Sequence, residues 1–191
     1  MTIYVCRHGR TEANASGLLL GRADPSLDAV GRRQAASIAA VLPADAAIFS
    51  SPLRRCRETA EAYGPGVAID DALIELDYGE FDLTSMADIP AETMREWRAN
   101  PEFTPPNGES LQELADRVAD FFDRIADITV ERDVVIFTHV SPIKASVAWA
   151  LGVGIGISWR SHVAQASISK IEVSRRGVSL HAFNLVDHLE S

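Results

Sequence analysis

A short apolar run near the start of the chain ends abruptly in a positively charged turn. Residues 3–6 are apolar, and Arg7, His8 and Gly9 follow at once. An apolar run of this length is typical of a buried strand, and ligands of open α/β sheets bind at the carboxyl ends of the strands. The sequence therefore predicts a buried strand that carries an arginine and a histidine into a phosphate-binding site.

Strands and helices alternate along the rest of the chain, as an α/β sheet requires. A helix follows Asp28, which is the expected N-cap, and Arg175 to Gly177 predict a hairpin between the last two strands. The predicted strands cover residues 3–6, 46–50, 133–138, 166–174 and 178–184, and the predicted helices cover residues 31–42, 51–63, 91–98, 111–130 and 143–151.

The length of the chain fits one domain over residues 1–191. With 191 residues and a hydrophobic content of 47%, the chain is long enough to bury a core. The alternating pattern breaks down between about residues 70 and 107, where short apolar pieces precede a proline-rich segment. We interpret this stretch as a cap-like insertion over a site.

The net charge of −9 excludes a typical nucleic-acid partner, because such proteins carry a basic excess. No run approaches the roughly 20 apolar residues needed to span a bilayer, and the N-terminal residues lack the features of a signal peptide. We therefore expect a cytoplasmic protein with no membrane partner. The two cysteines are too few for a disulfide framework. A homodimer remains an open alternative.

Two predicted strands end in a histidine, and a third passes into an arginine-bearing helix. The histidines are His8 and His139, and the arginine is Arg55. If these strands are parallel neighbours, their carboxyl ends meet at one edge of the sheet. The two imidazoles and the arginines Arg7 and Arg55 are then expected to converge on a phosphoryl group.

Five motifs follow one another along the chain. They are Arg7-His8-Gly9 with Thr11 and Asn14, Ser51-Pro52-Leu53-x-Arg55 with Thr59-Ala60, Glu75 before Tyr78-Gly79, Gly108-Glu109-Ser110, and Thr138-His139. In this order they resemble the histidine phosphatase superfamily, in the branch related to cofactor-dependent phosphoglycerate mutases. The resemblance implies a three-layer α/β/α fold with a mostly parallel central sheet.

The resemblance also implies the catalytic roles. His8 matches the nucleophile, and a neutral imidazole attacks phosphorus without prior deprotonation. Arg7 and Arg55 match the arginines that clamp the phosphoryl oxygens, and His139 matches the second histidine, which donates to a phosphoryl oxygen. Glu75 stands at the position of the general acid and base.

Further residues are candidates for holding the substrate or for the acid and base role. Asn14 matches a neutral donor in the same pocket, and Gly21, in the loop after the catalytic turn, is expected to contact the substrate beyond its phosphate. The rivals of Glu75 for the acid and base role are Asp77, Glu80 and Asp82, which stand close to it in the chain.

Two positions depart from the family pattern. Arg10 stands where an acidic or amide residue is usual, and we expect it to add positive potential at the mouth of the site. Val140 replaces a common glycine after His139, and Pro142 has no N–H to donate. The amides of Val140 and Ser141 are the remaining candidate donors to phosphate at the start of the following helix.

The resemblance implies a phosphomonoesterase that hydrolyses a small phosphorylated metabolite through a phosphohistidine. Phosphoglycerate mutase-type transfer between hydroxyls is the alternative, because both reactions use the same intermediate and differ in the acceptor. Mutases usually carry a longer insertion, which favours hydrolysis here. A phosphate-binding protein without turnover is a third hypothesis, which the intact catalytic set disfavours. We expect no metal or other cofactor, because arginines neutralise the phosphate charge.

Overall fold

The computed structural model describes residues 1–128 and 132–189. Its sheet has the strand order β3-β2-β4-β1-β5-β6. The first four strands in this order run parallel, and β5 and β6 form an antiparallel hairpin beside β1. The strands are β1 (Thr2–Arg7), β2 (Ala47–Ser50), β3 (Ala68–Ile69), β4 (Val134–Thr138), β5 (Ile168–Ser174) and β6 (Gly177–Leu185).

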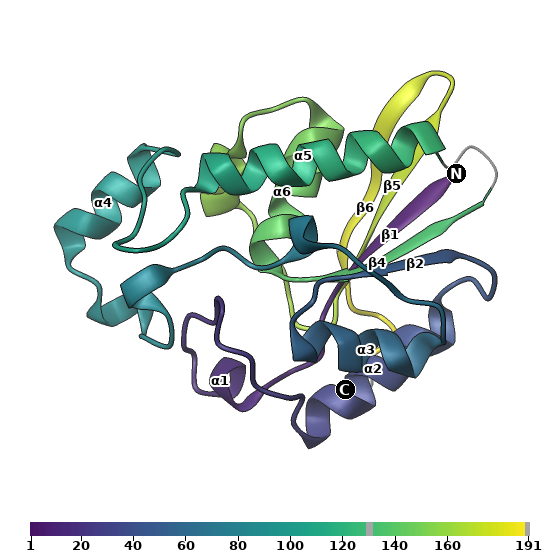
Figure 1. The fold of residues 1–191 in the computed structure, drawn as a ribbon, viewed down its shortest axis with the longest axis horizontal. Coiled ribbons are helices and arrows are strands. Elements are labelled where there is room, and N and C mark those ends of the chain that lie inside the picture. Colours follow the sequence, from purple (N-terminus) through teal and green to yellow (C-terminus); the bar gives the residue numbers. More distant parts are fainter. Residues whose placement is uncertain (129–131, 190–191) are drawn as a thin grey trace.

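Helices cover both faces of this sheet and complete three layers. Figure 1 shows α2 and α3 together on one face and α5 and α6 on the other. The predicted α/β/α architecture is confirmed. The helices are α1 (Glu12–Ala15), α2 (Ala29–Val41), α3 (Arg54–Tyr63), α4 (Ala91–Ala99), α5 (Leu111–Ile128) and α6 (Val140–Leu151).

The central strand β4 explains why two helical layers are needed. All five of its residues are buried. Successive side chains of a strand point to opposite faces, so Val134 and Ile136 join the core under α5 and α6, whereas Val135 and Phe137 join the core under α2 and α3. A strand that is apolar on both faces is stable only where both are covered.

Two helices that begin near a proline start three residues away from their predicted first residue. Helix α3 begins at Arg54, so Pro52 precedes the helix instead of standing in its first turn. Helix α6 begins at Val140, directly after His139, and Pro142 lies within its first turn. Proline is tolerated there because the first N–H groups of a helix have no partner within the helix. Residues 129–130 of the predicted long helix lie outside the described residues.

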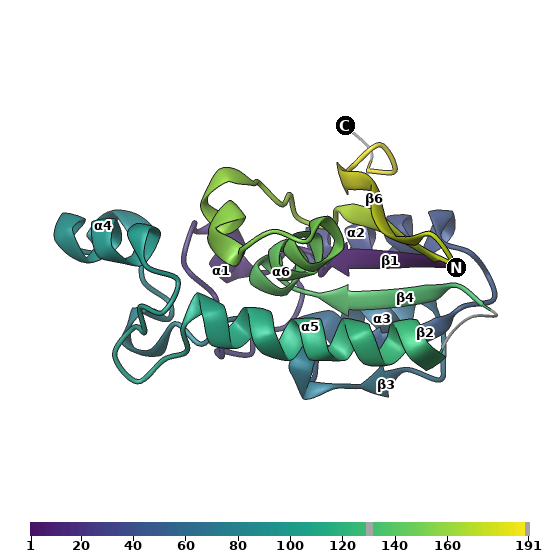
Figure 2. The same ribbon diagram turned by 90° about the horizontal axis from the view of Figure 1, so that it is seen from above.

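The segment between β3 and α5 lies beyond the carboxyl ends of the parallel strands. It contains the 3-10 turns η1 (Asp71–Leu73), η2 (Gly79–Phe81) and η3 (Met86–Asp88), followed by α4. Figure 2 shows α4 beyond the arrowheads of β1 and β4. Trp97 of α4 is only 2% exposed and packs against the rings of Tyr78, Phe81, Phe103 and Trp159.

Within the described part of the chain, no helix is long and apolar enough to cross a membrane.

The turn after β1 packs directly on the start of α2. Asp28 caps α2 by accepting from the Gly31 N–H at 2.7 Å, which confirms the predicted N-cap. A Cβ atom at Gly9 would lie 2.3 Å from the Gly31 carbonyl oxygen. Arg10 forms an ion pair with Asp28 at 2.7 Å. This turn therefore depends on glycine, and Arg10 is held against the cap of α2.

Gly9→Ala is expected to lower the free energy of unfolding by about 1–3 kcal/mol, because the added methyl group meets backbone atoms of α2. Urea unfolding followed by circular dichroism measures the change. Gly64→Ala is the matched control, since a Cβ there has no neighbour within 4 Å, and its expected effect is below about 0.5 kcal/mol. Equal midpoints for Gly9→Ala and the wild type would contradict the close contact.

Candidate active site

The ends of three adjacent parallel strands bring the predicted histidines together. In the sheet, Arg7 of β1 is paired with Thr138 of β4, and β2 lies on the other side of β4. His8 and His139 follow these two paired residues, and their ring centroids are 5.1 Å apart with an interplanar angle of 62°. The convergence predicted from the sequence is therefore present.

His8 is held in one tautomer by the turn that follows it. Its backbone N–H donates to the Thr138 carbonyl at 3.0 Å, and its Nδ1 lies 2.7 Å from the Gly9 carbonyl oxygen. Because a carbonyl oxygen only accepts, Nδ1 carries the proton. The other ring nitrogen, Nε2, keeps a free lone pair.

Burial and positive charge keep both histidines neutral. Burial lowers the pKa of His8 well below its usual range, and the charges of Arg55 and Arg7 lower it further, against the opposing hydrogen bond to Gly9. Burial and Arg55 likewise hold the pKa of His139 well below its usual range. A neutral imidazole is the form that acts as a nucleophile.

Arg55 and His139 lie together behind the cavity. Arg55 Nε donates to His139 Nδ1 at 3.1 Å, so His139 Nε2 carries the proton and donates to Ser51 Oγ at 2.8 Å. The other Arg55 N–H groups donate to the carbonyls of Leu20, Gly21 and Ala23. Both Arg55 and His139 are fully buried. In this arrangement Arg55 orders the loop around residue 21 and fixes the tautomer of His139.

Arg7 carries a buried N–H group without a hydrogen-bond acceptor among the described residues. Its Nη1 donates to the Val163 carbonyl at 2.8 Å. Its Nε is buried and has no hydrogen-bond partner among the described residues. A buried donor without an acceptor is costly, so the oxygen of an anionic ligand is the natural partner for this atom.

Glu75 occupies the N-terminus of α6. Its carboxylate oxygens accept from the N–H groups of Val140 at 3.0 Å and Ser141 at 3.1 Å, and Oε1 also accepts from Leu76 at 2.8 Å. Pro142 has no N–H to add. The amides of Val140 and Ser141, which the sequence offered as phosphate donors, are therefore bound to a carboxylate of the protein itself.

The rivals of Glu75 are engaged elsewhere. Asp77 accepts from the Gly79 N–H and pairs with Arg22, and Glu80 accepts from Asn107. Asp82 accepts from the N–H groups of Gly21 and Ala23. Of these four carboxylates, Glu75 alone lines the cavity beside His8.

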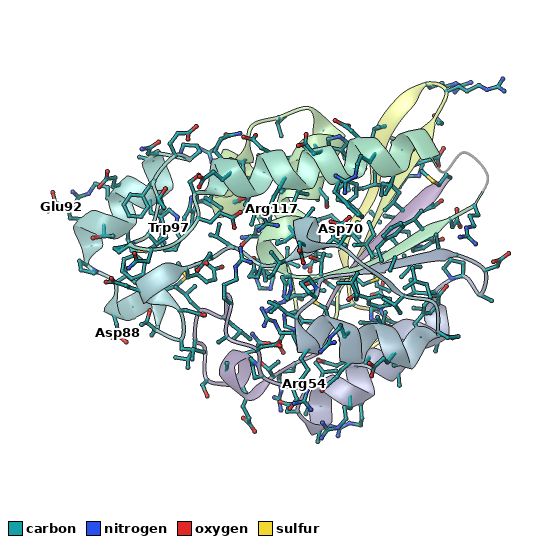
Figure 3. All side chains as sticks on the ribbon, in the orientation of Figure 1. Arg54, Asp70, Asp88, Glu92, Trp97 and Arg117 are labelled. Carbon is teal, nitrogen blue, oxygen red and sulfur yellow. The ribbon has the colours of Figure 1, made fainter. Side chains whose placement is uncertain are left out.

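Arg117 of α5 supports the loop that carries Glu75, and sequence reasoning missed it. It donates to the carbonyls of Ala72 at 2.7 Å and Glu75 at 3.3 Å. It also contacts both carboxylate oxygens of Glu109, at 2.6 and 2.9 Å. Figure 3 shows Arg117 on the side of α5 that faces this loop. No local pattern in the sequence marks it, because its partners lie 8 to 45 residues away.

A cavity of about 200 Å³ opens at this edge of the sheet. The predicted site residues that line it are Arg7, His8, Asn14, Glu75 and Val140. Arg55, His139 and Gly21 are outside its lining. Other residues complete the wall, among them Tyr78, Trp97, Ser141, Lys144 and Trp159.

The two candidate substrate contacts from the N-terminal part of the chain, Asn14 of α1 and Gly21 of the following loop, differ in their placement. Asn14 Oδ1 accepts from the Thr11 N–H at 3.2 Å, which leaves its amide nitrogen to donate into the cavity it lines. Gly21 instead uses its N–H on Asp82 and its carbonyl on Arg55. A Cβ at Gly21 would lie 2.8 Å from the Leu76 carbonyl oxygen. Gly21 therefore allows close packing of the loop.

Comparisons with known proteins agree with this geometry. A profile of the histidine phosphatase superfamily (branch 1) matches residues 3–186. The bifunctional protein Rv2228c of Mycobacterium tuberculosis is 35% identical over an alignment of 187 residues that covers 93% of this chain. The chain spans 51% of the length of that relative.

Two relatives match over nearly their whole length. Phosphoserine phosphatase 1 of Hydrogenobacter thermophilus is 30% identical, with coverage of 98% of this chain and 93% of that protein. The crystal structure of α-ribazole phosphatase from Shigella flexneri has a TM-score of 0.84 at 26% identity, and the match covers 97% of this chain and 96% of the other. The chain belongs to branch 1 of the histidine phosphatase superfamily.

Proposed function

We propose that this chain is a phosphomonoesterase that transfers the phosphoryl group of a small phosphorylated metabolite first to His8 and then to water. One observation carries the proposal. His8 lines the cavity as an imidazole whose Nδ1–H is bonded to the Gly9 carbonyl, so Nε2 keeps its lone pair. The phosphatase names of the Hydrogenobacter and Shigella relatives support the same class of reaction.

In the first step, His8 Nε2 forms a bond to phosphorus while the ester oxygen leaves. A phosphoryl oxygen accepts from the buried Nε–H of Arg7, which has no partner within the described residues. Arg55 adds positive charge from behind the cavity, where burial limits screening by water. Negative charge that develops on the phosphoryl group is stabilised by these two guanidinium groups.

Glu75 is the proposed proton donor to the leaving oxygen and the proton acceptor from water in the second step. The amides of Leu76, Val140 and Ser141 hold its carboxylate in one orientation at the cavity wall. Water then attacks the phosphohistidine, the N–P bond breaks, and inorganic phosphate leaves. His139 joins the reaction only if its Nε2–H exchanges Ser51 Oγ for a phosphoryl oxygen.

His8→Ala is expected to lower kcat/KM for p-nitrophenyl phosphate by about 10³-fold or more, because it removes the atom that bonds to phosphorus. A colorimetric assay measures the loss, and acid-labile phosphate on the peptide with His8 should disappear with it. His181→Ala is the control, since His181 lies exposed on β6. Hydrolysis that survives His8→Ala would refute the proposal.

A separate experiment tests whether water or a second substrate hydroxyl accepts the phosphoryl group. With 3-phosphoglycerate and a bisphosphoglycerate primer, we expect release of inorganic phosphate and no accumulation of 2-phosphoglycerate. Robust isomerisation would assign the chain to phosphoryl transfer between hydroxyls.

Glu75→Gln is expected to lower kcat/KM for an alkyl phosphate by about 10²–10⁴-fold, because an alkoxide leaves poorly without a proton. For p-nitrophenyl phosphate, whose phenolate leaves readily, the loss should be below about tenfold. Steady-state kinetics with both esters gives the ratio. Glu80→Gln is the matched control, as Glu80 is exposed and outside the cavity lining. Equal losses on the two esters would argue against proton donation by Glu75.

The neutral histidines predict a loss of stability in mild acid. The unfolded chain protonates each histidine near pH 6.5, whereas the folded protein, with the pKa of His8 and of His139 depressed, does not. As the pH falls from 7 to 5, the unfolded state binds more protons and the free energy of unfolding decreases, by up to about 1.4 kcal/mol per pH unit for each histidine. Urea unfolding at several pH values should show a smaller slope for His8→Asn. An unchanged slope would show that His8 is protonated in the folded state.

A further inference from the structure

A second cation lines the cavity, and the catalytic steps do not use it. Lys144 lies one helical turn after Val140 on α6, so both residues lie on the same face of the helix. Its Nζ donates to the Ser158 carbonyl at 2.6 Å in the 3-10 segment η4 (Ile155–Arg160). Sequence reasoning did not single out Lys144, because its contact with Ser158 joins two separate elements.

Lys144 has no carboxylate partner. No aspartate or glutamate oxygen of the described residues lies within ion-pair distance of Nζ, so one carbonyl contact serves a group with three N–H donors. Burial lowers the pKa of Lys144, and the nearby charge of Glu75 opposes this while Arg7 adds to it. A half-buried ammonium group without a counter-ion is stabilised by an anion that binds beside it.

Other hydrogen-bonding groups lie on the same part of the wall. Ser158 is 5% exposed and lines the cavity, and its buried Oγ has no partner among the residues described. The hydroxyls of Tyr78 and Ser141 lie 3.5 Å apart, and burial raises the pKa of Tyr78, which keeps its O–H as a donor. The cavity wall thus offers hydroxyl groups in addition to the Lys144 ammonium.

We propose that Lys144 and Ser158 form a second anion subsite, which binds a carboxylate on the leaving group of the substrate. The inference rests on the phosphatase activity proposed above and names the class of substrate: a short phosphomonoester of a hydroxy acid or hydroxy amino acid. A cavity of about 200 Å³ holds a phosphoryl group with only a short carbon skeleton.

The charges of the site agree with such a substrate. Arg7, Arg55 and Lys144 supply three positive charges at or directly behind the cavity. A phosphate dianion and one carboxylate supply three negative charges. With the proton for the leaving oxygen on Glu75, as the proposed mechanism requires, the charges of a hydroxy acid ester balance those of the three cations. The ammonium group of a hydroxy amino acid ester adds one further positive charge.

The alternative is that Lys144 only ties α6 to η4 through its bond to Ser158. That role depends on the Ser158 carbonyl and does not change the relative affinity for different ligands. A carboxylate subsite, in contrast, discriminates between two phosphate esters that differ in that group alone. O-phospho-L-serine and O-phosphoethanolamine are such a pair, since only the first has a carboxylate.

The test measures how strongly each of these two compounds inhibits hydrolysis of p-nitrophenyl phosphate. In the wild type, we expect the inhibition constant of phosphoserine to be at least about tenfold lower than that of phosphoethanolamine, because a charge-assisted hydrogen bond adds to binding. Lys144→Met should abolish most of this ratio, and Lys144→Arg should retain part of it. Lys170→Met is the matched control, because Lys170 lies on β5 against Tyr4, away from the cavity.

The inhibition and hydrolysis results distinguish a failure of the anion subsite from a failure of the proposed phosphatase activity. A wild type without preference for phosphoserine, or a Lys144→Met variant with the wild-type ratio, would overturn the subsite while leaving the phosphatase activity intact. If Lys144→Met fails to fold, Ser158→Ala gives the same test, since it removes the free hydroxyl and should lower the ratio. Absence of p-nitrophenyl phosphate hydrolysis by the wild type would instead overturn the proposed function itself.

Discussion

The pairing of β1 with β4 is the constraint on which the site depends. The register that sets Arg7 beside Thr138 also sets the next residues, His8 and His139, beside each other. The His8 amide then continues the pairing by donating to the Thr138 carbonyl. A shift of one residue would turn every side chain of the strand to the other face, so the apolar core on both sides of β4 also protects the geometry of the two imidazoles.

The N-terminus of α6 binds a carboxylate of the protein itself, that of Glu75. The N–H groups of Val140 and Ser141 point at Glu75 and hold it at the cavity wall. Anions are stabilised at this end of a helix, and here the anion is supplied by the segment that follows β3. Arg117 fixes the other end of the arrangement through the backbone of Glu75. The carboxylate of Glu75 is thus positioned by elements far apart in the chain.

Two half-buried cations without counter-ions among the described residues make the cavity locally positive. The chain as a whole carries a net charge of −9, yet Arg7 and Lys144 line the cavity with no carboxylate paired to either within the described residues. Local charge acts strongly here because burial reduces screening by solvent. Burial, together with the charges of Arg55 and Arg7, lowers the pKa of both histidines and keeps them neutral.

The sequence by itself determined the α/β class and the order of the elements, because the periodicity of strands and helices is a local property. It predicted that His8 and His139 meet only if their strands pair, and that pairing joins segments far apart in the chain. Only the tertiary structure decided which of four nearby carboxylates faces the cavity, that the α6 amides bind Glu75, and that Arg10 pairs with Asp28. Only the tertiary structure placed Arg117 and Lys144 at the site, for the same reason. Their partners are backbone carbonyls and side chains of other elements, and such long-range contacts leave no periodic signal in the chain.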